Sequence, residues 1–371
     1  MARPRARRLE PARLGRVRAA AQLLHRPSSL RDPADVVRRA AGIQAQDANA
    51  ARLGIRARSG TVAASHVDRA RAEDRSIVRT WAMRGTLHLL ATEDLAWQRP
   101  LFARRELEWS RRRLSEALGV GRRTQDRAVR LIARVLEADG IVTRREIMDR
   151  LESGGIEFDR QTAGHHLPRL AVLEGIACLG PDRGRDTTYV LAHDWIGEPR
   201  TADRERALAE VARRYVAGFG PADAEDMASW AGLGLGDCRA ALASIASELA
   251  EVRVGTRTLL APRRGAPRAP RRRLVRLLPG FDNYLLGHRD REFAVDPRHV
   301  REVWPGGGII RPTVVVDGRV VGTWTTRRAS GRVRVSLRAL EPLEDDITEA
   351  ISREVDDVGR FEGLTATLVN T

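Results

Sequence analysis

The middle of the chain carries the clearest alternation of apolar and polar positions. From Thr124 to Ala138, apolar side chains recur every three or four residues, as they do on one face of a helix. Thr143 and Glu146 form a capping box that begins a second helix. A third helix is predicted over residues 160–174, and residues 175–190 alternate as two strands around the turn PDRGRD. Three helices followed by a hairpin predict a winged-helix module.

The same order of elements is predicted twice more. The later copy has helices at 203–218, 221–231 and 235–249 and a hairpin at 251–261 that turns at Gly255-Thr256. The earlier, looser copy has helices at 14–25, 33–41, 49–58 and 62–73 and a hairpin at 76–90 that turns near Arg84-Gly85. A long charged helix over residues 92–118 links the first copy to the second.

The pattern changes after an Arg/Pro-rich stretch, RRGAPRAPRRR, which is expected to be an extended linker. Beyond it, three segments alternate like strands, at 314–316, 319–325 and 332–337, with turns at Asp317-Gly318 and Ser330-Gly331. One helix is predicted at about 343–355, within an acidic cluster. This part of the chain is therefore expected to be a small β-rich domain, shaped like a barrel.

The predicted fold class is α+β, with three tandem winged-helix modules followed by a small β-barrel-like C-terminal domain. The predicted segments are 1–120 (first winged helix with its linking helix), 121–198 (second), 199–262 (third), 263–273 (linker) and 274–371 (C-terminal domain).

Charge narrows the range of functions. The 371 residues include 65 basic side chains, all of them arginine, and the formal net charge is +16. Without lysine there is no Walker phosphate loop and no lysine Schiff base. Planar guanidinium groups bind phosphate well, so the partner is expected to be a polyanion, most simply nucleic acid.

Other features point to an intracellular setting. Cys178 and Cys238 have no CxxC spacing, so neither a metal knuckle nor a disulfide framework is expected. No apolar run approaches the length of a membrane span. We therefore expect a cytoplasmic, nucleoid-associated monomer that uses no metal or cofactor and does not bind a membrane.

Candidate catalytic chemistry is concentrated in one short segment. There is no HExxH and no Gly-x-Ser-x-Gly elbow. In the turn before the helix that starts at Ala48, Gln44 and Gln46 are two apart and are expected to project together, with Ala45 turned inward. The alternative is that both glutamines decorate a solvated turn. Asp47 is either the N-cap of the next helix or a general base.

Four motifs in order resemble the AlkZ/YcaQ-type bacterial DNA glycosylases: GIQAQD, WAMRGTLHLLATEDLAW, LLPGFDNYLLGHRDR and VVGTWT. The likeness runs over nearly the whole chain. It implies that Gln44 and Gln46 match the family's catalytic Gln-x-Gln pair. Members of this form resemble self-resistance enzymes of antibiotic producers, which remove bulky N7-alkylguanine adducts. The family often has an aromatic residue where this chain has His288.

The implied activity suits two uncharged side chains. A glutamine amide does not titrate, but it can orient a water and stabilise positive charge on the sugar. An N7-alkylated guanine is already cationic and leaves without protonation. Without lysine, the glycosylase is expected to be monofunctional and to leave an abasic site. Its partner is expected to be double-stranded DNA that contains alkylated purines. The alternative function is a non-enzymatic winged-helix transcriptional regulator.

Polar residues elsewhere are candidates for contact with DNA. They are Arg84, Thr86 and His88 on the first hairpin, Asn283, Arg289 and Arg291 in the third motif, and Arg327, Arg328, Arg332 and Arg334 around the Ser330-Gly331 turn. The alternative for the third motif is a salt network around Asp282 and Asp290. Trp324 is expected in the domain core, with stacking against DNA as the alternative.

Overall fold

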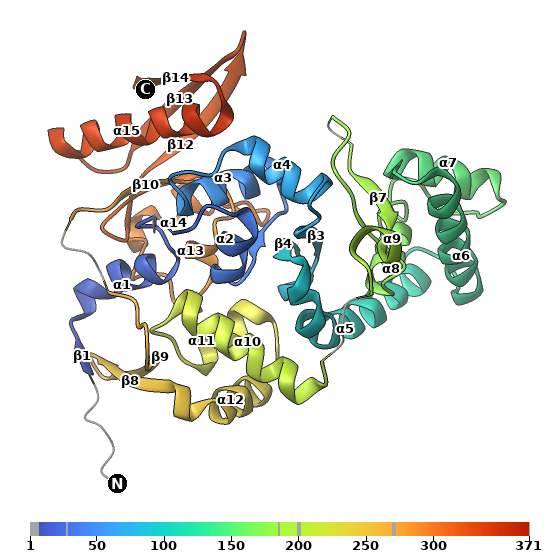
Figure 1. Ribbon diagram of the computed structural model, residues 1–371, viewed down its shortest axis with the longest axis horizontal. Coiled ribbons are helices and arrows are strands. Elements are labelled where there is room, and N and C mark those ends of the chain that lie inside the picture. The colour runs from blue at the N-terminus through green and yellow to red at the C-terminus, as the bar shows by residue number, and fades with distance from the viewer. Residues whose placement is uncertain (1–6, 27–28, 185, 199–201, 269–271, 371) are drawn as a thin grey trace. The chain divides into compact units, whose positions relative to one another are not determined.

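The computed structural model describes residues 7–26, 29–184, 186–198, 202–268 and 272–370, which form two compact units (Figure 1). Unit 1 brings together residues 1–67 and 208–371, and unit 2 comprises residues 68–207. The units therefore do not coincide with the linear segments predicted above, because the N-terminal part of the chain packs with its C-terminal half. Within the described residues, no helix combines the length and the apolar character that a bilayer span needs.

The N-terminal part follows the prediction closely. It contains, in order, β1 (Arg7–Leu9), α1 (Leu14–Ala21), α2 (Pro33–Arg39), β2 (Ile43–Gln44), α3 (Ala48–Arg58) and α4 (Ala64–Ala72). Asp32 caps α2 by accepting from the amide of Ala34, and Pro33 occupies the first helical turn, where its missing N–H costs nothing. This local chemistry explains why the helix starts were predictable.

Unit 2 is built on a hairpin, a long helix and the middle block of the chain. Its elements are β3 (Ile77–Trp81), β4 (Leu87–Ala91), α5 (Leu95–Glu116), α6 (Arg122–Asp139), β5 (Val142–Thr143), α7 (Arg144–Ser153), α8 (His166–Leu173), β6 (Ala177–Leu179), β7 (Thr188–Leu191) and α9 (Ala192–Ile196). Within this unit the strands lie in the order β4-β3-β6-β7-β5. The capping box of Thr143 and Glu146 is present, as predicted. The apolar face of α6 packs into a core around Ile132, Leu136 and Leu167.

One prediction in unit 2 is wrong in its bounds. The third helix of the middle block was expected over 160–174, but α8 begins only at His166. Asp159 accepts from the amides of Gln161 and Thr162, which holds the preceding residues in turns. Every residue of α8 is buried. In the middle block the third helix is therefore part of the core rather than an exposed helix.

The third block of helices and strands pairs with the strand β1 near the N-terminus. Its elements are α10 (Arg204–Phe219), α11 (Ala224–Ala231), α12 (Leu235–Ser244), β8 (Leu249–Val254) and β9 (Arg257–Pro262). The hairpin turns at Gly255, as predicted, and β1 adds to its edge parallel to β8 (Figure 1). The predicted helix start at Pro221 is wrong, because α11 is capped by Asp223 and begins at Ala224.

The C-terminal part is an open sheet. It contains β10 (Val275–Leu278), α13 (Asn283–Leu286), α14 (Val300–Val303), β11 (Thr313–Val316), β12 (Arg319–Ala329), β13 (Arg332–Ala339), α15 (Asp345–Glu362) and β14 (Thr365–Asn370). The strands lie in the order β10-β11-β12-β13-β14, with β14 parallel to β13, and α15 packs on the sheet (Figure 1). Because the described edge strands β10 and β14 do not pair, the sheet is a half-barrel, which is an open form of the barrel-like domain that the sequence predicted.

The turns and the linker complete the comparison. Asp317-Gly318 and Ser330-Gly331 adopt positive φ at both positions, as tight hairpin turns require. In the linker, residues 264–268 form neither helix nor strand, and residues 269–271 lie outside the described part of the chain.

Candidate active site

Gln44 and Gln46 lie on either side of a buried alanine. Gln44 is the second residue of the short strand β2, and Gln46 lies in the bend before α3. Ile43 and Ala45 are 3% and 0% exposed, which agrees with the predicted inward position of Ala45. Gln44 is itself 7% exposed, whereas Gln46 is exposed. The pair is therefore not a solvated decoration at both positions, because one of its members is buried.

The chain enters this segment through a closed helix end. The amide of Gly42 donates to the carbonyl of Val37, and the amide of Ala41 donates to Arg38. Ala41 has a φ of 60°, so it occupies the left-handed position that usually favours glycine. This Schellman-type ending stops α2 at Arg39 and leads the backbone into β2 at Ile43.

Asn283 holds the same turn from a distant part of the chain. Its Oδ1 accepts from the amide of Gln44 at 2.9 Å, and its Nδ2 donates to the carbonyls of Gly42 and, at 3.4 Å, Ala40. Asn283 is 5% exposed. All of these groups are internal, so the predicted contact between Asn283 and DNA does not fit its position. Its carboxamide binds the backbone of the glutamine segment instead.

Asp282, the neighbour of Asn283, is fixed by a buried arginine. Arg58, the last residue of α3, donates from both Nη atoms to the two carboxylate oxygens of Asp282, at 2.8 Å each. Arg58 also donates to Oε1 of Gln22 at 2.8 Å. A fork-to-fork pair of this kind fixes orientation as well as distance. Asp282 therefore does form an ion pair, as the alternative for the third motif expected, but its arginine is Arg58 of α3.

Asp47 caps the helix that follows the glutamines. Its Oδ1 accepts from the amide of Ala50 at 2.9 Å, and its backbone is extended. Both features are those of an N-cap. The helix-cap interpretation of Asp47 is confirmed.

Of the three candidate DNA-contact residues on the first hairpin, two are partly exposed and one is buried. Arg84 has a φ of 56° in the turn, and Oγ1 of Thr86 donates to the carbonyl of Met83 at 3.0 Å. His88 is 1% exposed, and its Nδ1 donates to the carbonyl of Thr86 at 3.1 Å. Burial, with Arg84 nearby, lowers the pKa of His88 to about 3. A buried, neutral ring does not fit the predicted contact of His88 with DNA, while Arg84 and Thr86 stay partly exposed.

The end of the third motif is also divided. Arg289 is exposed, and its backbone amide donates to Asp226. Arg291 is half-buried and stacks over the ring of Trp304 at 5.0 Å, and burial lowers its pKa. His288 lies edge-on to Phe219 and Phe293. His288 therefore lies among aromatic rings in this chain.

The hairpin of β12 and β13 exposes its arginines. Arg327 and Arg334 are directly opposite in register, and Arg332 faces Ala329, so these three arginines share one face. Arg328 belongs to the other face and pairs with Glu362 at 2.7 Å. Trp324 is 2% exposed and donates from Nε1 to the carbonyl of Leu278, so its predicted place in the core is confirmed.

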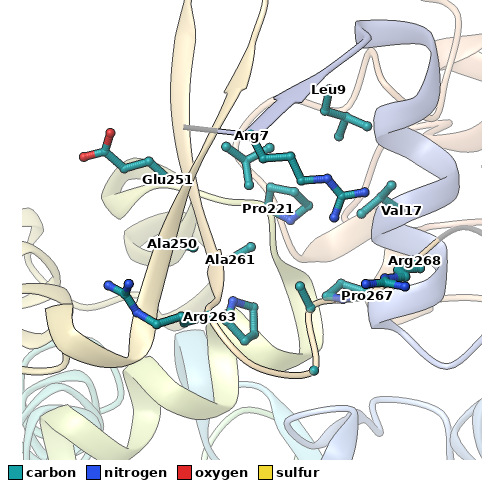
Figure 2. Close-up of a pocket in the computed structure, with 14 residues that line it drawn as sticks. Arg7, Leu9, Val17, Pro221, Ala250, Glu251, Ala261, Arg263, Pro267 and Arg268 are labelled. Carbon is teal, nitrogen blue, oxygen red and sulfur yellow. The ribbon is translucent and has the colours of Figure 1, made fainter. Parts of the chain in front are cut away.

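A cavity of about 360 Å³ lies elsewhere in unit 1, beside β1, β8 and β9. Figure 2 shows the side chains of Arg7, Arg263 and Arg268 around it, with Leu9 and Val17 on the wall. Gln44 and Gln46 do not line it. The candidate catalytic segment is therefore separate from this cavity. Among the described residues, no three His, Cys, Asp or Glu side chains gather as a metal site.

Sequence reasoning missed Arg58 and the inward role of Asn283. Both contacts join residues more than two hundred positions apart. The only local signal is an arginine among the buried residues of α3, and it is one of 65 arginines in the chain.

The comparisons with known proteins agree with one another. Residues 37–361 match the model of the family described as DNA glycosylase AlkZ-like. An interstrand DNA cross-link repair glycosylase of Streptomyces sahachiroi is 32% identical over 313 residues, which cover 80% of this chain and 83% of that protein. The solved structure of S. sahachiroi DNA glycosylase AlkZ is similar with a TM-score of 0.76 and 27% identity, and covers 98% of this chain and 100% of its own. The mixed α+β fold therefore matches that of AlkZ.

Proposed function

Because this chain belongs to the AlkZ-like DNA glycosylases, we propose that it hydrolyses the N-glycosidic bond of cationic N7-alkylguanine in double-stranded DNA. The observation that carries the proposal is the rigidly held backbone of Gln44, two residues from Gln46 at the start of a capped helix. A backbone held in this way can present the side-chain amides of Gln44 and Gln46 to one water, because little conformational freedom has to be lost first.

This mechanism requires no general acid from the protein. An alkylated N7 leaves the purine positively charged, so the base departs with the electrons of the glycosidic bond and needs no proton. The amides of Gln44 and Gln46 orient the attacking water and stabilise the oxocarbenium-like sugar with their oxygens. Water adds to C1′ and loses its proton to solvent. Neutral bases such as uracil are poor substrates for this mechanism, because they leave slowly without protonation.

The natural lesion is proposed to be a bulky adduct or a crosslink. The similar S. sahachiroi protein is named an interstrand DNA cross-link repair glycosylase. A role in DNA repair or in antibiotic self-resistance follows from this likeness. Since the chain has no lysine, we expect no lysine imine and hence an abasic site, not a cut strand, as the product.

We infer that the protein meets duplex DNA as a cytoplasmic, nucleoid-associated monomer. Three blocks of helices, each followed by a hairpin, support the assignment of winged-helix modules. The exposed arginines of β12 and β13 support phosphate contacts. A purely regulatory role is not favoured, because the family match covers residues 37–361 of the chain, including both glutamines.

One incubation tests the proposal. Duplex DNA carrying 7-methylguanine is treated with wild type, Gln44→Ala or Gln46→Ala, and abasic sites are then cut with alkali. We expect wild type to release the base and each variant to lose about 10²-fold in rate, as when one preorganised stabilising dipole is removed. DNA affinity should be retained. Release of uracil as fast as 7-methylguanine would overturn the mechanism.

A further inference from the structure

The backbone N–H of Gln44 donates to the side chain of Asn283, which lies 239 positions away in the sequence. β2 has only two residues, and a strand this short has little register of its own. The segment also follows two residues with positive φ, Ala41 and Gly42. Its position must therefore be set by contacts from other elements.

Asn283 supplies these contacts with its whole carboxamide. The oxygen accepts one N–H, from Gln44, and the nitrogen has both of its hydrogens directed at the carbonyls of Ala40 and Gly42. An amide is the side chain that offers both an acceptor and two donors in one plane. An aspartate has the same shape but no donors, so it would set its oxygens against two carbonyls.

Asn283 is in turn held by the far end of α3. Arg58 binds both oxygens of Asp282, which also caps α13 by accepting from the amide of Tyr284. All three residues of the set Arg58, Asp282 and Asn283 are buried. Along α3, Gly54 lets Ile43 of β2 approach so closely that an added Cβ would lie 3.2 Å from it. Thus α3, which begins two residues after Gln46, is joined at its other end through Arg58 to Asp282, the neighbour of Asn283. The hydrogen bonds of Asn283 to residues 40–44 form a clamp on the glutamine segment.

We propose that Asn283 is a positioning residue for catalysis, which sets the position of Gln44 through one hydrogen bond to its backbone N–H and two to the carbonyls of Ala40 and Gly42, and which is itself oriented by the Arg58–Asp282 pair. This inference rests on the proposed function, because it assigns Asn283 an effect on rate through Gln44. It also makes a structural statement that does not depend on activity, namely that Asn283 protects the amide of Gln44.

The experiment compares Asn283→Asp and Asn283→Ala with Tyr284→Phe as the matched control. Tyr284 is the next residue of α13, is equally buried, and donates its hydroxyl to the carbonyls of Gly15 and Gly318, away from the glutamines. Single-turnover release of 7-methylguanine is measured at a temperature below the unfolding transition of each variant. We expect both Asn283 variants to lose about 10²-fold in rate with unchanged DNA affinity, and Tyr284→Phe to lose stability but not rate.

A double variant shows whether Asn283 acts through Gln44. If it does, Gln44→Ala/Asn283→Asp is no slower than Gln44→Ala, because the group that Asn283 positions is already gone. Additive losses would overturn the positioning role. If Gln44→Ala keeps the wild-type rate, the proposed function of the pair fails by itself.

Amide hydrogen exchange gives a readout that is independent of activity. In Asn283→Ala, exchange over residues 40–46 should become faster than in wild type, while in Tyr284→Phe it should stay unchanged. Equal exchange in all three proteins would overturn the inference even if Gln44 and Gln46 prove catalytic. If exchange is faster only in Asn283→Ala but wild type releases no 7-methylguanine, the structural role of Asn283 is retained and the proposed substrate is rejected.

Discussion

Asp47 is the only carboxylate in the motif GIQAQD, and its side chain is committed to the first turn of α3 through the amide of Ala50. We expect Asp47→Asn to retain most of the rate of base release, because asparagine caps a helix about as well as aspartate. Loss of a general base would instead slow release by about 10²–10⁴-fold. The rate constant on 7-methylguanine DNA distinguishes the two roles.

The control for Asp47 is its alanine variant. Asp47→Ala removes the cap and should lower the free energy of unfolding by about 1 kcal/mol, measured by urea denaturation. A rate for Asp47→Asn as low as that of Gln44→Ala would contradict the cap as the sole role of this carboxylate.

His88 gives a second prediction at the scale of one residue. Its pKa is about 3 in the fold, against an ordinary value of 6.5, because burial disfavours the charged ring. Between these values the unfolded chain binds a proton that the folded protein does not, so the free energy of unfolding decreases as the pH falls from 6.5 towards 3. From pH 7 to pH 5 the loss from this one group is about 2 kcal/mol.

Urea denaturation at pH 5 and pH 7 measures this effect. The variant His88→Gln keeps a polar side chain but does not titrate, so its loss of stability on acidification should be smaller than that of wild type. The same pH dependence in both proteins would show that His88 takes up its proton in the folded state.

At the scale of elements, α15 is attached by a buried cluster of charges. Glu354 forms ion pairs with Arg26 at 2.9 Å and with Arg56 and Arg276 at 3.1 Å each, and it accepts a hydrogen bond from the backbone amide of Leu277. Asp357 pairs with Arg26 and Arg56 as well. The acidic stretch noted in the sequence therefore neutralises the buried Arg56 and the partly buried Arg26 and Arg276, and these pairs join α15 to α3 and β10.

We expect Glu354→Gln to lower the free energy of unfolding by about 3–5 kcal/mol, because it removes the buried carboxylate that Arg26, Arg56 and Arg276 share. Denaturant titration measures the change. The matched control is Glu349→Gln on the same helix, whose carboxylate is exposed and pairs with Arg353 at 3.7 Å. It should cost less than about 0.5 kcal/mol. Equal effects of the two variants would mean that the cluster does not hold α15.

The elements also show which features a sequence can reveal. The Asp47 cap, the capping box at Thr143 and the Ser330-Gly331 turn depend on residues within a few positions of one another, and all three were predicted correctly. The clamp of Asn283, the Arg58–Asp282 pair and the parallel pairing of β14 with β13 join distant segments. An asparagine or arginine carries no mark of its partner, so these contacts were not predictable, and Asn283 was assigned to DNA instead of to the glutamine segment.

At the scale of the whole molecule, the net charge of +16 does not by itself show which arginines bind the phosphates of DNA. Many arginines are already paired with carboxylates, including the buried Arg18 with Asp226 and Arg58 with Asp282. These pairs contribute to the fold and not to DNA binding. The arginines that remain for DNA are the exposed ones, and those on one face of the β12–β13 hairpin form the most regular group.

Salt dependence measures this contribution. Each phosphate that an arginine neutralises adds about 0.9 to the slope of log affinity against log salt concentration on duplex DNA. We expect the triple variant Arg327→Gln/Arg332→Gln/Arg334→Gln to lower that slope by up to about 2.7 if each residue binds one phosphate. Arg328→Gln is the matched control in the same hairpin, because Arg328 lies on the other face and pairs with Glu362. It should leave the slope nearly unchanged. If the triple variant keeps the wild-type slope, the hairpin does not bind the DNA backbone, and the phosphate contacts must come from arginines on other elements.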